Sequence, residues 1–381
     1  MVIRDIQAFS AKDVAKYAWS RISHFQNVSH TTNVIASLHA LPQRHLTNAK
    51  SQAEELKYCL SQAKEYFDAA AVVSLATRPL LLYYGAMSMA LAEILLKQSA
   101  DSRLAKLREH HDCHGLCFVV ESDLKPTDSL GDATRKLSAK AQTLPTGDPK
   151  GTFEIWRRSA REYPVGGYTK KVMVGATEEG YQTLLYAADI APRKLDSTGL
   201  SLSDCLGQLP YMHDLLLHFG GPFSMVRATI KQEENAGVAS RILIVHPTEQ
   251  VALEQFQSQL QMPADSINYV QITELDGGFI LQHQLLHDRP GILHYPEATC
   301  LTTRHVFFSC KPYALNEFGH LYVALHICGN LARYYPDLWL KHIQVSSPLA
   351  MAIDELCSHA TERLPLLCLS ELLRKYLIAE G

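Results

Sequence analysis

The segment ATRPLLLYYGAMSMALAEILL, Ala76 to Leu96, decides the fold. Pro79 suits the first turn of a helix, where its missing N–H removes no hydrogen bond, so a helix is predicted to begin there. From Leu80 to Leu96 the residues are apolar on nearly every side of that helix, which is typical of a buried helix. Arg78 and Pro79 interrupt the longer apolar run that contains it, which favours a core helix over a membrane span.

Helical patterns extend to both sides of this segment. The N-terminal third carries apolar residues near a 3.6-residue period in KDVAKYAWSRISHF, and a long helix-forming stretch runs from Thr47 to Ser74. Three further helices are predicted near the C-terminus, at Leu321–Ala332, Ser347–Ala360 and Pro365–Ile378. The C-terminal helices are expected to pack back on the N-terminal ones.

The middle of the chain differs from both ends in composition and in its predicted secondary structure. From about Ser122 to Asp148 it is polar, with prolines and glycines typical of an exposed excursion. Short strands are predicted at SRILIVHP and RHVFFSC, with a hairpin around Asp276-Gly277-Gly278 and an amphipathic helix at Thr248–Met262. The expected fold is mainly α (α+β), with a helical region 1–121, a mixed α/β section 122–315 and C-terminal helices 316–381.

Composition narrows the function classes only a little. The formal net charge of -3 gives no whole-chain case for a nucleic-acid binder, although it leaves room for a local basic face. Nine cysteines, an odd number scattered over the chain, fit a reducing cytoplasm better than a disulfide framework. The first residues lack the long apolar core of a secretory signal, and no membrane association is expected.

Two separate blocks resemble a known family. The first is the Ala76–Leu96 segment with His114-Gly115-Leu116 after it, and the second is LYVALHICGNLARYYPDLW, Leu321 to Trp339. Together they resemble the YaaC-like proteins, a bacterial family, over essentially the whole chain. This resemblance implies a fold rather than an activity. The Tyr-Tyr helix and the histidine after it are more distantly similar to the all-helical HEPN group, which implies a HEPN-like helical core.

The HEPN resemblance implies a ribonuclease motif in REHHDCHGLC, Arg108 to Cys117. Many HEPN proteins are toxins or antiviral defence ribonucleases that act as dimers through an Arg-polar-x(4–6)-His motif, which Arg108 and His114 match in length. An arginine can stabilise charge on the phosphorus, and an imidazole can move the 2′-hydroxyl proton. Against this, Glu109 is expected to pair with Arg108. The alternative is a solvated helix end with Gly115 as its left-handed cap.

Six further basic residues are candidates for contacts with a nucleic acid or a partner. Tyr334, Tyr335 and Trp339 are placed to stack bases beside a guanidinium, or else to form the aromatic end of a core helix. The segment WRRSAR with the two lysines that follow it is the most basic local patch, or else a solvated helix face. For the two arginines outside that patch, an internal salt bridge is the alternative. The candidates are Arg78, Arg157, Arg158, Lys170, Lys171 and Arg333.

No metal site or cofactor is expected. His110, Cys113 or His114, and Cys117 have the helical spacing of zinc ligands, but no second ligand pair lies near and Gly115 would interrupt the helix. Cys117 is instead expected to be a small buried residue that opens the strand CFVV. The sequence also lacks a Gly-x(4)-Gly-Lys-Ser/Thr loop, a dinucleotide-binding glycine fingerprint and a Gly-x-Ser-x-Gly elbow.

Three functions follow as hypotheses. The first is a cytoplasmic binding component of a bacterial defence or stress system, which recognises RNA, DNA or a partner protein of the same system. The second is a HEPN-like metal-independent ribonuclease that uses Arg108 and His114, with a homodimer as its expected form. The third is a purely structural or interaction subunit.

Overall fold

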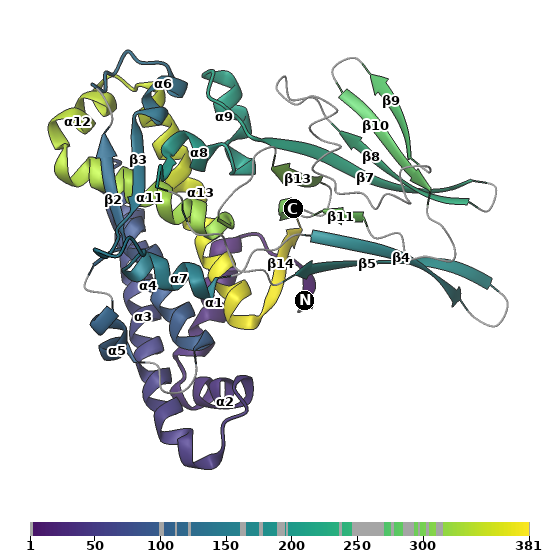
Figure 1. Ribbon diagram of the computed structural model, residues 1–381, viewed down its shortest axis with the longest axis horizontal. Helices are drawn as coiled ribbons and strands as arrows, with labels where there is room; N and C mark the ends of the chain where they lie inside the picture. Colours follow the sequence, from purple (N-terminus) through teal and green to yellow (C-terminus); the bar gives the residue numbers. More distant parts are fainter. Residues whose placement is uncertain are drawn as a thin grey trace.

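A helical body and a set of long strands make up the molecule (Figure 1). The helices lie on the left of that view, and the hairpins β4–β5 and β7–β8 extend to the right. The computed structural model describes residues 3–98, 103–110, 113–120, 123–160, 165–174, 178–188, 195, 197–235, 238–245, 270–275, 278–284, 293–295, 298–301, 305–309 and 315–380. The mainly α (α+β) class expected from the sequence is confirmed.

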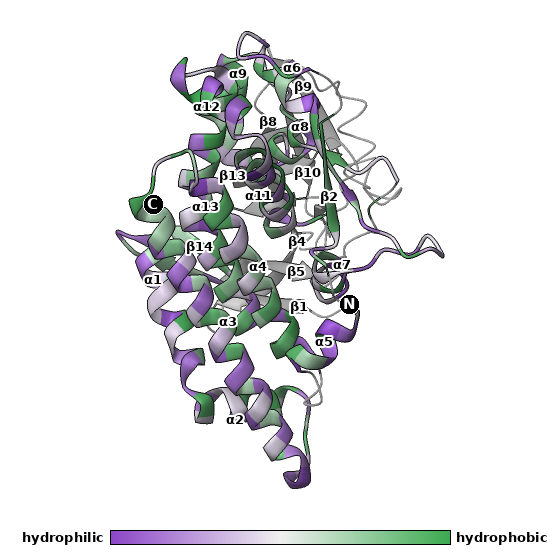
Figure 2. Cartoon of the chain, turned by 90° about the vertical axis from the view of Figure 1, so that its left-hand side faces the viewer, coloured by the Kyte–Doolittle hydropathy of each residue, from purple (hydrophilic) through white to green (hydrophobic). Residues whose placement is uncertain are grey.

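The helical body is built from N-terminal and C-terminal helices together. Its α-helices are α1 (Val14–Ile22), α2 (Val28–Leu38), α3 (Leu46–Val72), α4 (Arg78–Lys97), α5 (Leu104–His110), α6 (Leu130–Arg135), α7 (Thr152–Ser159), α8 (Leu202–Leu206), α9 (His213–His218), α11 (Glu317–Tyr334), α12 (Pro336–Gln344) and α13 (Pro348–Leu373). Short 3-10 turns are η1 (Ser23–Gln26), η2 (Gln43–His45) and η3 (Pro210–Met212). Hydrophilic residues are frequent on the outer helices α1 and α5 (Figure 2).

Helix α4 is the centre of this body, as its sequence predicts. It packs against α3, α11, α13 and α7, and most of its residues are buried. Pro79 lies in its first turn, and its last carbonyls are bonded by side chains from other helices. The Gln52 amide donates to the carbonyls of Leu95 and Gln98, and Nε2 of His39 lies 3.0 Å from the Leu96 carbonyl. These bonds satisfy carbonyls that a helix end leaves without a partner.

Within the described residues, α4 alone is long and apolar enough to cross a membrane. However, 72% of its most apolar window is buried inside the protein. The core helix of a protein passes the same test, so this finding is weak evidence for a membrane span.

The C-terminal helices differ from the sequence prediction. The two helices expected on either side of Pro365 form one helix, α13, with Pro365 inside it. A proline removes one backbone hydrogen bond, but both halves of α13 are buried against the body, and this packing sustains the helix. The helix ends at Leu373, where Arg374 adopts a left-handed conformation with φ of 57°. The expected last turns of helix are instead strand β14 (Lys375–Glu380).

Strand β14 joins the two ends of the chain. It pairs in parallel with β1 (Ile3–Ser10), which has Gln7 opposite Leu377. Together they form one edge of a five-stranded sheet in the order β11-β4-β5-β1-β14. Neither strand is predicted from the sequence, because each lies alone at one end of the chain without a local partner.

The strands predicted at SRILIVHP and RHVFFSC are confirmed, whereas the long strands Glu178–Ala188 and Met225–Asn235 are not predicted from the sequence. The hairpin predicted around Asp276-Gly277-Gly278 is confirmed as β9 and β10. The predicted helix Thr248–Met262 lies outside the described residues. The strands are β2 (Leu116–Val120), β3 (Leu137–Ala141), β4 (Val165–Val174), β5 (Glu178–Ala188), β6 (Leu200–Ser201), β7 (Met225–Asn235), β8 (Val238–Val245), β9 (Val270–Leu275), β10 (Gly278–Gln284), β11 (Leu293–Tyr295), β12 (Ala298–Leu301) and β13 (His305–Ser309).

The polar stretch from about Ser122 to Asp148 is not an exposed excursion. It contains α6 and β3, and the side chains of Leu130 and Leu137 are fully buried in the main core. Strand β3 pairs with β2 and β6 in a three-stranded sheet that lies against α11. The stretch reads as polar because several of the residues it buries, such as Thr134, Ser138 and Ala139, are small or polar.

Candidate functional site

The loop before β2 holds His114 rigidly. The N–H groups of Thr152 and Phe153, at the start of α7, donate to the carbonyls of Cys113 and His114, both at 3.1 Å. On the other side, Gly115 N donates to the side chain of Gln142 at 3.0 Å and its carbonyl accepts from the Gln142 N–H at 3.0 Å. The histidine therefore projects from a loop that is bonded on both sides.

Gly115 has a packing role rather than the capping role expected from the sequence. Helix α5 ends at His110, so Gly115 is not its cap, although its φ of 86° is left-handed. A Cβ on Gly115 would lie 2.8 Å from the Lys150 carbonyl oxygen, and one on Gly151 would lie 2.4 Å from the Gly115 Cα. Two backbone segments thus meet at glycines, which lets the start of α7 approach the His114 loop.

His114 is accessible to solvent and lies among aromatic rings of α4. Its Nδ1 is 3.3 Å from the Sδ of Met87, and its ring centroid is 5.8 Å from that of Tyr83 and 6.2 Å from that of Tyr84. Partial burial, and then the charge of Arg333, lower the pKa of His114 below its ordinary value. The imidazole is therefore a neutral base at pH 7.

Arg333 is the positively charged residue that contributes to the lowered pKa of His114. Its Nη1 donates to the hydroxyl of Tyr84 at 2.7 Å, and its guanidinium lies 5.0 Å from the ring centroid of Tyr334. Arg333 lies in the last turn of α11 and is exposed. We call Tyr84, His114 and Arg333 the α4–α11 cluster.

A buried histidine lies behind this cluster. His326 on α11 is nearly inaccessible, and its ring lies edge-on to Tyr83 at 5.1 Å. Burial, with a further contribution from His114, lowers the pKa of His326 to about 3. Asn330 donates from Nδ2 to the His326 carbonyl at 2.7 Å. His326 is thus neutral and serves as packing for the cluster.

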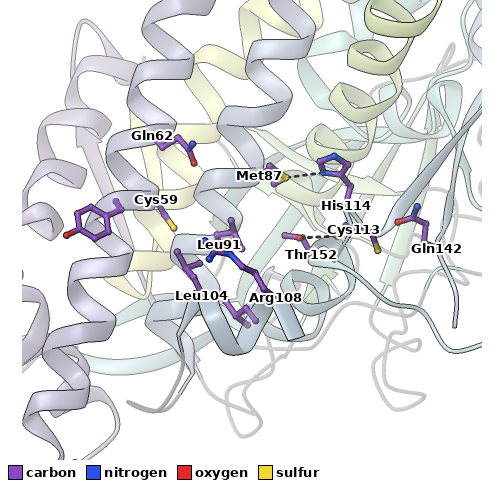
Figure 3. Close-up of a pocket in the computed structure, with 12 residues that line it drawn as sticks. Cys59, Gln62, Met87, Leu91, Leu104, Arg108, Cys113, His114, Gln142 and Thr152 are labelled. Carbon is purple, nitrogen blue, oxygen red and sulfur yellow. Dashed lines mark hydrogen bonds between the residues drawn. The ribbon is translucent and has the colours of Figure 1, made fainter. Parts of the chain in front are cut away.

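Arg108 and His114 line the same cleft of one chain, beside the cluster. The cleft measures about 610 Å³, and none of its described lining residues is an Asp or Glu. In Figure 3 the Arg108 guanidinium lies beside Leu91, whereas His114 lies on the far side of Met87. Burial of Cys59, on the α3 wall, raises the pKa of that thiol to about 12, and the charge of Arg108 partly opposes the shift. The cleft is lined by Tyr58, Cys59, Gln62, Met87, Leu91, Leu104, Leu107, Arg108, Cys113, His114, Gln142 and Thr152.

Arg78 lies apart from this site. Its Nη1 is 2.9 Å from the Asp354 carboxylate on α13, and its Nη2 donates to the Val73 carbonyl at 3.4 Å. It ties the start of α4 to α13 through a salt bridge, the alternative that the sequence left open.

The basic segment of α7 is largely internal. Arg157 donates twice to the Glu154 carboxylate, at 2.8 and 2.7 Å, and Arg158 donates to the same group at 2.8 Å. Arg157 is buried, whereas the side chain of Arg158 is 62% exposed. Trp156 is fully buried and cannot stack a base. Lys170 and Lys171 are consecutive residues of β4.

The REHHDCHGLC stretch does not assemble a metal site in the part that is described. Within the described residues, no group of three His, Cys, Asp or Glu side chains is close enough to hold an ion. Cys117 is the second residue of strand β2 rather than its first, and it is exposed rather than buried as expected. The preceding Leu116 is the buried residue, and successive strand residues face opposite sides.

Replacing Arg78 by glutamine should lower the stability of the protein only slightly. The pair with Asp354 is partly exposed, so we expect the free energy of unfolding to fall by about 0.2–1 kcal/mol. Urea denaturation measures this change, and Asp354→Asn should give a similar loss. A loss above about 3 kcal/mol would show that the pair is part of the core.

Comparison with known proteins agrees with the resemblance seen in the two sequence blocks. The model of the YaaC-like protein family matches residues 23–116 and 173–372, which include His114 and Arg333 but not Arg157. Neither the curated proteins nor the solved structures gave a match. Because the family model covers most of the sequence, the chain belongs to the YaaC-like protein family.

Proposed function

We propose that the chain binds single-stranded nucleic acid, RNA or DNA, across the α4–α11 cluster and the neighbouring cleft. The observation that carries this proposal is the placement of Arg333. Its guanidinium is exposed, is oriented by Tyr84, and has no carboxylate partner among the described residues. An arginine held in this way presents its remaining N–H groups to a phosphate.

Aromatic side chains near the cluster suit the stacking of bases. Tyr334 is 60% exposed and Tyr335 is 40% exposed, and Tyr58 at the cleft is 62% exposed. The rings of Tyr66 and Tyr84 stack with their centroids 5.6 Å apart, and the Tyr84 hydroxyl is bonded to Arg333. Proteins that bind single strands combine cations with such rings, because every base offers a flat face.

The surface between the cleft and Arg333 is continuous on two helices. On α3, Tyr58, Gln62 and Tyr66 are four residues apart and therefore share one face. On α4, Tyr84, Met87 and Leu91 lie on successive turns of the facing side. A strand that crosses this surface would meet Arg108 at one end and Arg333 at the other.

The experiment is a titration of fluorescently labelled single-stranded RNA and DNA with the full chain, followed by anisotropy. We expect saturable binding that Arg333→Gln weakens about tenfold, the loss of one good charge-assisted contact. The matched control is Arg44→Gln, which removes an exposed arginine that belongs neither to the cluster nor to the cleft. Absence of saturable binding, or equal losses in the two variants, would refute the proposal.

A second candidate function is metal-independent cleavage of RNA. It is favoured by the lowered pKa of His114 together with a cation nearby, because a neutral imidazole can accept the 2′-hydroxyl proton. Arg333 would stabilise the charge that develops on the phosphorus, a role that the HEPN resemblance implies for Arg108. RNA incubated with the chain and EDTA should be cut, and His114→Ala should abolish cutting while RNA binding remains. Cutting by the His114→Ala variant would exclude this mechanism.

A role in bacterial defence or stress completes the proposal. A defence or stress role rests on the HEPN resemblance alone, and a partner protein of the same system is the alternative ligand if no nucleic acid binds. A cytoplasmic location suits the buried thiols of Cys59, Cys205, Cys328, Cys357 and Cys368.

A further inference from the structure

A second cavity lies where the two ends of the chain meet. Its volume is about 310 Å³, and none of its lining residues belongs to the cleft of His114. One wall comes from β1, α1, η1 and α2, and the other from the end of α13 and from β14. The parallel pairing of β1 with β14 brings these walls together. The cavity is lined by Gln7, Tyr17, Arg21, His24, Phe25, His30, Leu373, Lys375 and Leu377.

The polar side chains of this cavity favour an anion. Arg21 and Lys375 are cationic, His24 and His30 offer ring nitrogens for hydrogen bonds, and none of the described lining residues is an Asp or Glu. The Arg21 guanidinium lies 5.5 Å from the ring centroid of Tyr17 and has no ion pair among the described residues.

The ammonium of Lys375 already has a hydrogen-bond partner within the lining of the cavity. Its Nζ donates to Gln7 Oε1 at 3.2 Å. Arg21 therefore supplies most of the positive charge of the cavity. The ring nitrogens of His24 and His30 add hydrogen-bonding groups, so the polar lining comes from three neighbouring elements, α1, η1 and α2.

The apolar part of the lining is aromatic and well supported. Phe25 is buried and lies edge-on to His30, with the ring centroids 5.8 Å apart. Tyr17 stacks on Phe9 at 4.2 Å, with the two rings 12° from parallel. Leu373 and Leu377 complete the wall. A flat or apolar group would pack here, while its charged end faced the basic residues.

We propose that this cavity binds a small organic phosphate, a phosphate monoester that carries one flat group. A phosphate monoester has a charge of about −1.5 to −2 and three acceptor oxygens, which suits donors that approach from several directions. A carboxylate offers one charge and two oxygens. The volume lies at the lower end of the range for ligand pockets, so one nucleotide fits and a polynucleotide does not.

The test uses AMP as the probe, with adenosine and inorganic phosphate as partial ligands, in isothermal titrations of the full chain. We expect one saturable AMP site per chain, weaker binding of inorganic phosphate, and no binding of adenosine. Arg21→Gln should weaken AMP binding at least tenfold. Lys16→Gln, an exposed change on the same helix outside the lining, should leave it within twofold.

Three results would overturn the proposal: no saturable AMP binding, equal binding of AMP and adenosine, or equal effects of Arg21→Gln and Lys16→Gln. The Arg333→Gln variant separates this site from the nucleic-acid surface. It should keep the AMP affinity of the unmodified chain, and a tenfold loss would show that AMP binds at the α4–α11 cluster instead.

Discussion

Replacing Trp156 by alanine should lower the free energy of unfolding by about 3–5 kcal/mol. Trp156 is among the largest fully buried side chains described. Its ring stacks on Tyr322, with the ring centroids 6.0 Å apart, and lies against Phe318, with the centroids 5.1 Å apart. A Cβ on Gly319 would lie 2.9 Å from the indole, so α11 packs directly on this ring. The indole N–H also donates to the buried Glu93 carboxylate at 2.9 Å, which would lose that donor.

Urea denaturation followed by far-ultraviolet circular dichroism measures this loss. Arg158→Ala is the control on the same helix, because its side chain is 62% exposed, and it should change stability by less than about 1 kcal/mol. Similar losses for the two variants would contradict a core that is organised around Trp156.

The second large expected effect is that the buried carboxyl of Glu93 makes the free energy of unfolding depend on pH. Burial raises the pKa of this carboxyl from 4.5 to about 7, Lys97 opposes the shift, and Glu371 adds to it. The Lys97 ammonium lies 3.6 Å from Glu93 and also contacts Glu371 on α13. Two carboxylates thus share one cation inside the protein.

The direction of the effect follows from proton binding. Between pH 4.5 and about 7 the folded state holds a proton on Glu93 that the unfolded chain has lost. The contribution of Glu93 to stability is therefore complete below pH 4.5 and falls as the pH rises to about 7. Glu93→Gln stays neutral, so its stability relative to the unmodified chain should increase from pH 5 to pH 8 by at least about 1 kcal/mol.

Urea titrations at pH 5 and pH 8 test this expectation, because titrations elsewhere in the chain cancel between the two proteins. Glu65→Gln, an exposed change on α3, should show no such trend. A stability difference for Glu93→Gln that stays constant with pH would mean that Glu93 is charged throughout the range.

Much of the helical body could be predicted from local sequence. The position of Pro79 and the apolar run after it define α4, because both effects act within one helix. The β9–β10 hairpin likewise follows from the local turn signal at Asp276-Gly277. The prediction of a helix end at Pro365 is wrong. A proline disfavours a continuous helix, but the burial of both halves of α13 outweighs this local effect. The β1–β14 pair depends on two chain ends that meet only in the fold.

The candidate site shows the same division between local and distant effects. His114 was found in the sequence because its loop has a distinctive composition. Its neighbour Arg333 was found only as a separate candidate, since nothing in the sequence places the end of α11 beside the His114 loop. One local signal was missed. Glu154 precedes Arg157 and Arg158 by three and four residues, the spacing at which helical residues form ion pairs.

The salt dependence of nucleic-acid binding tests most directly whether Arg333 contacts a phosphate at the α4–α11 cluster. The logarithm of the binding constant falls linearly with the logarithm of salt concentration, with a slope of about −0.7 for each phosphate neutralised on a single strand. Affinities of the unmodified chain and of Arg333→Gln for single-stranded RNA, measured between low and high salt, should give slopes that differ by about 0.7. Parallel lines for the two proteins, or binding that does not change with salt, would contradict the proposed contact.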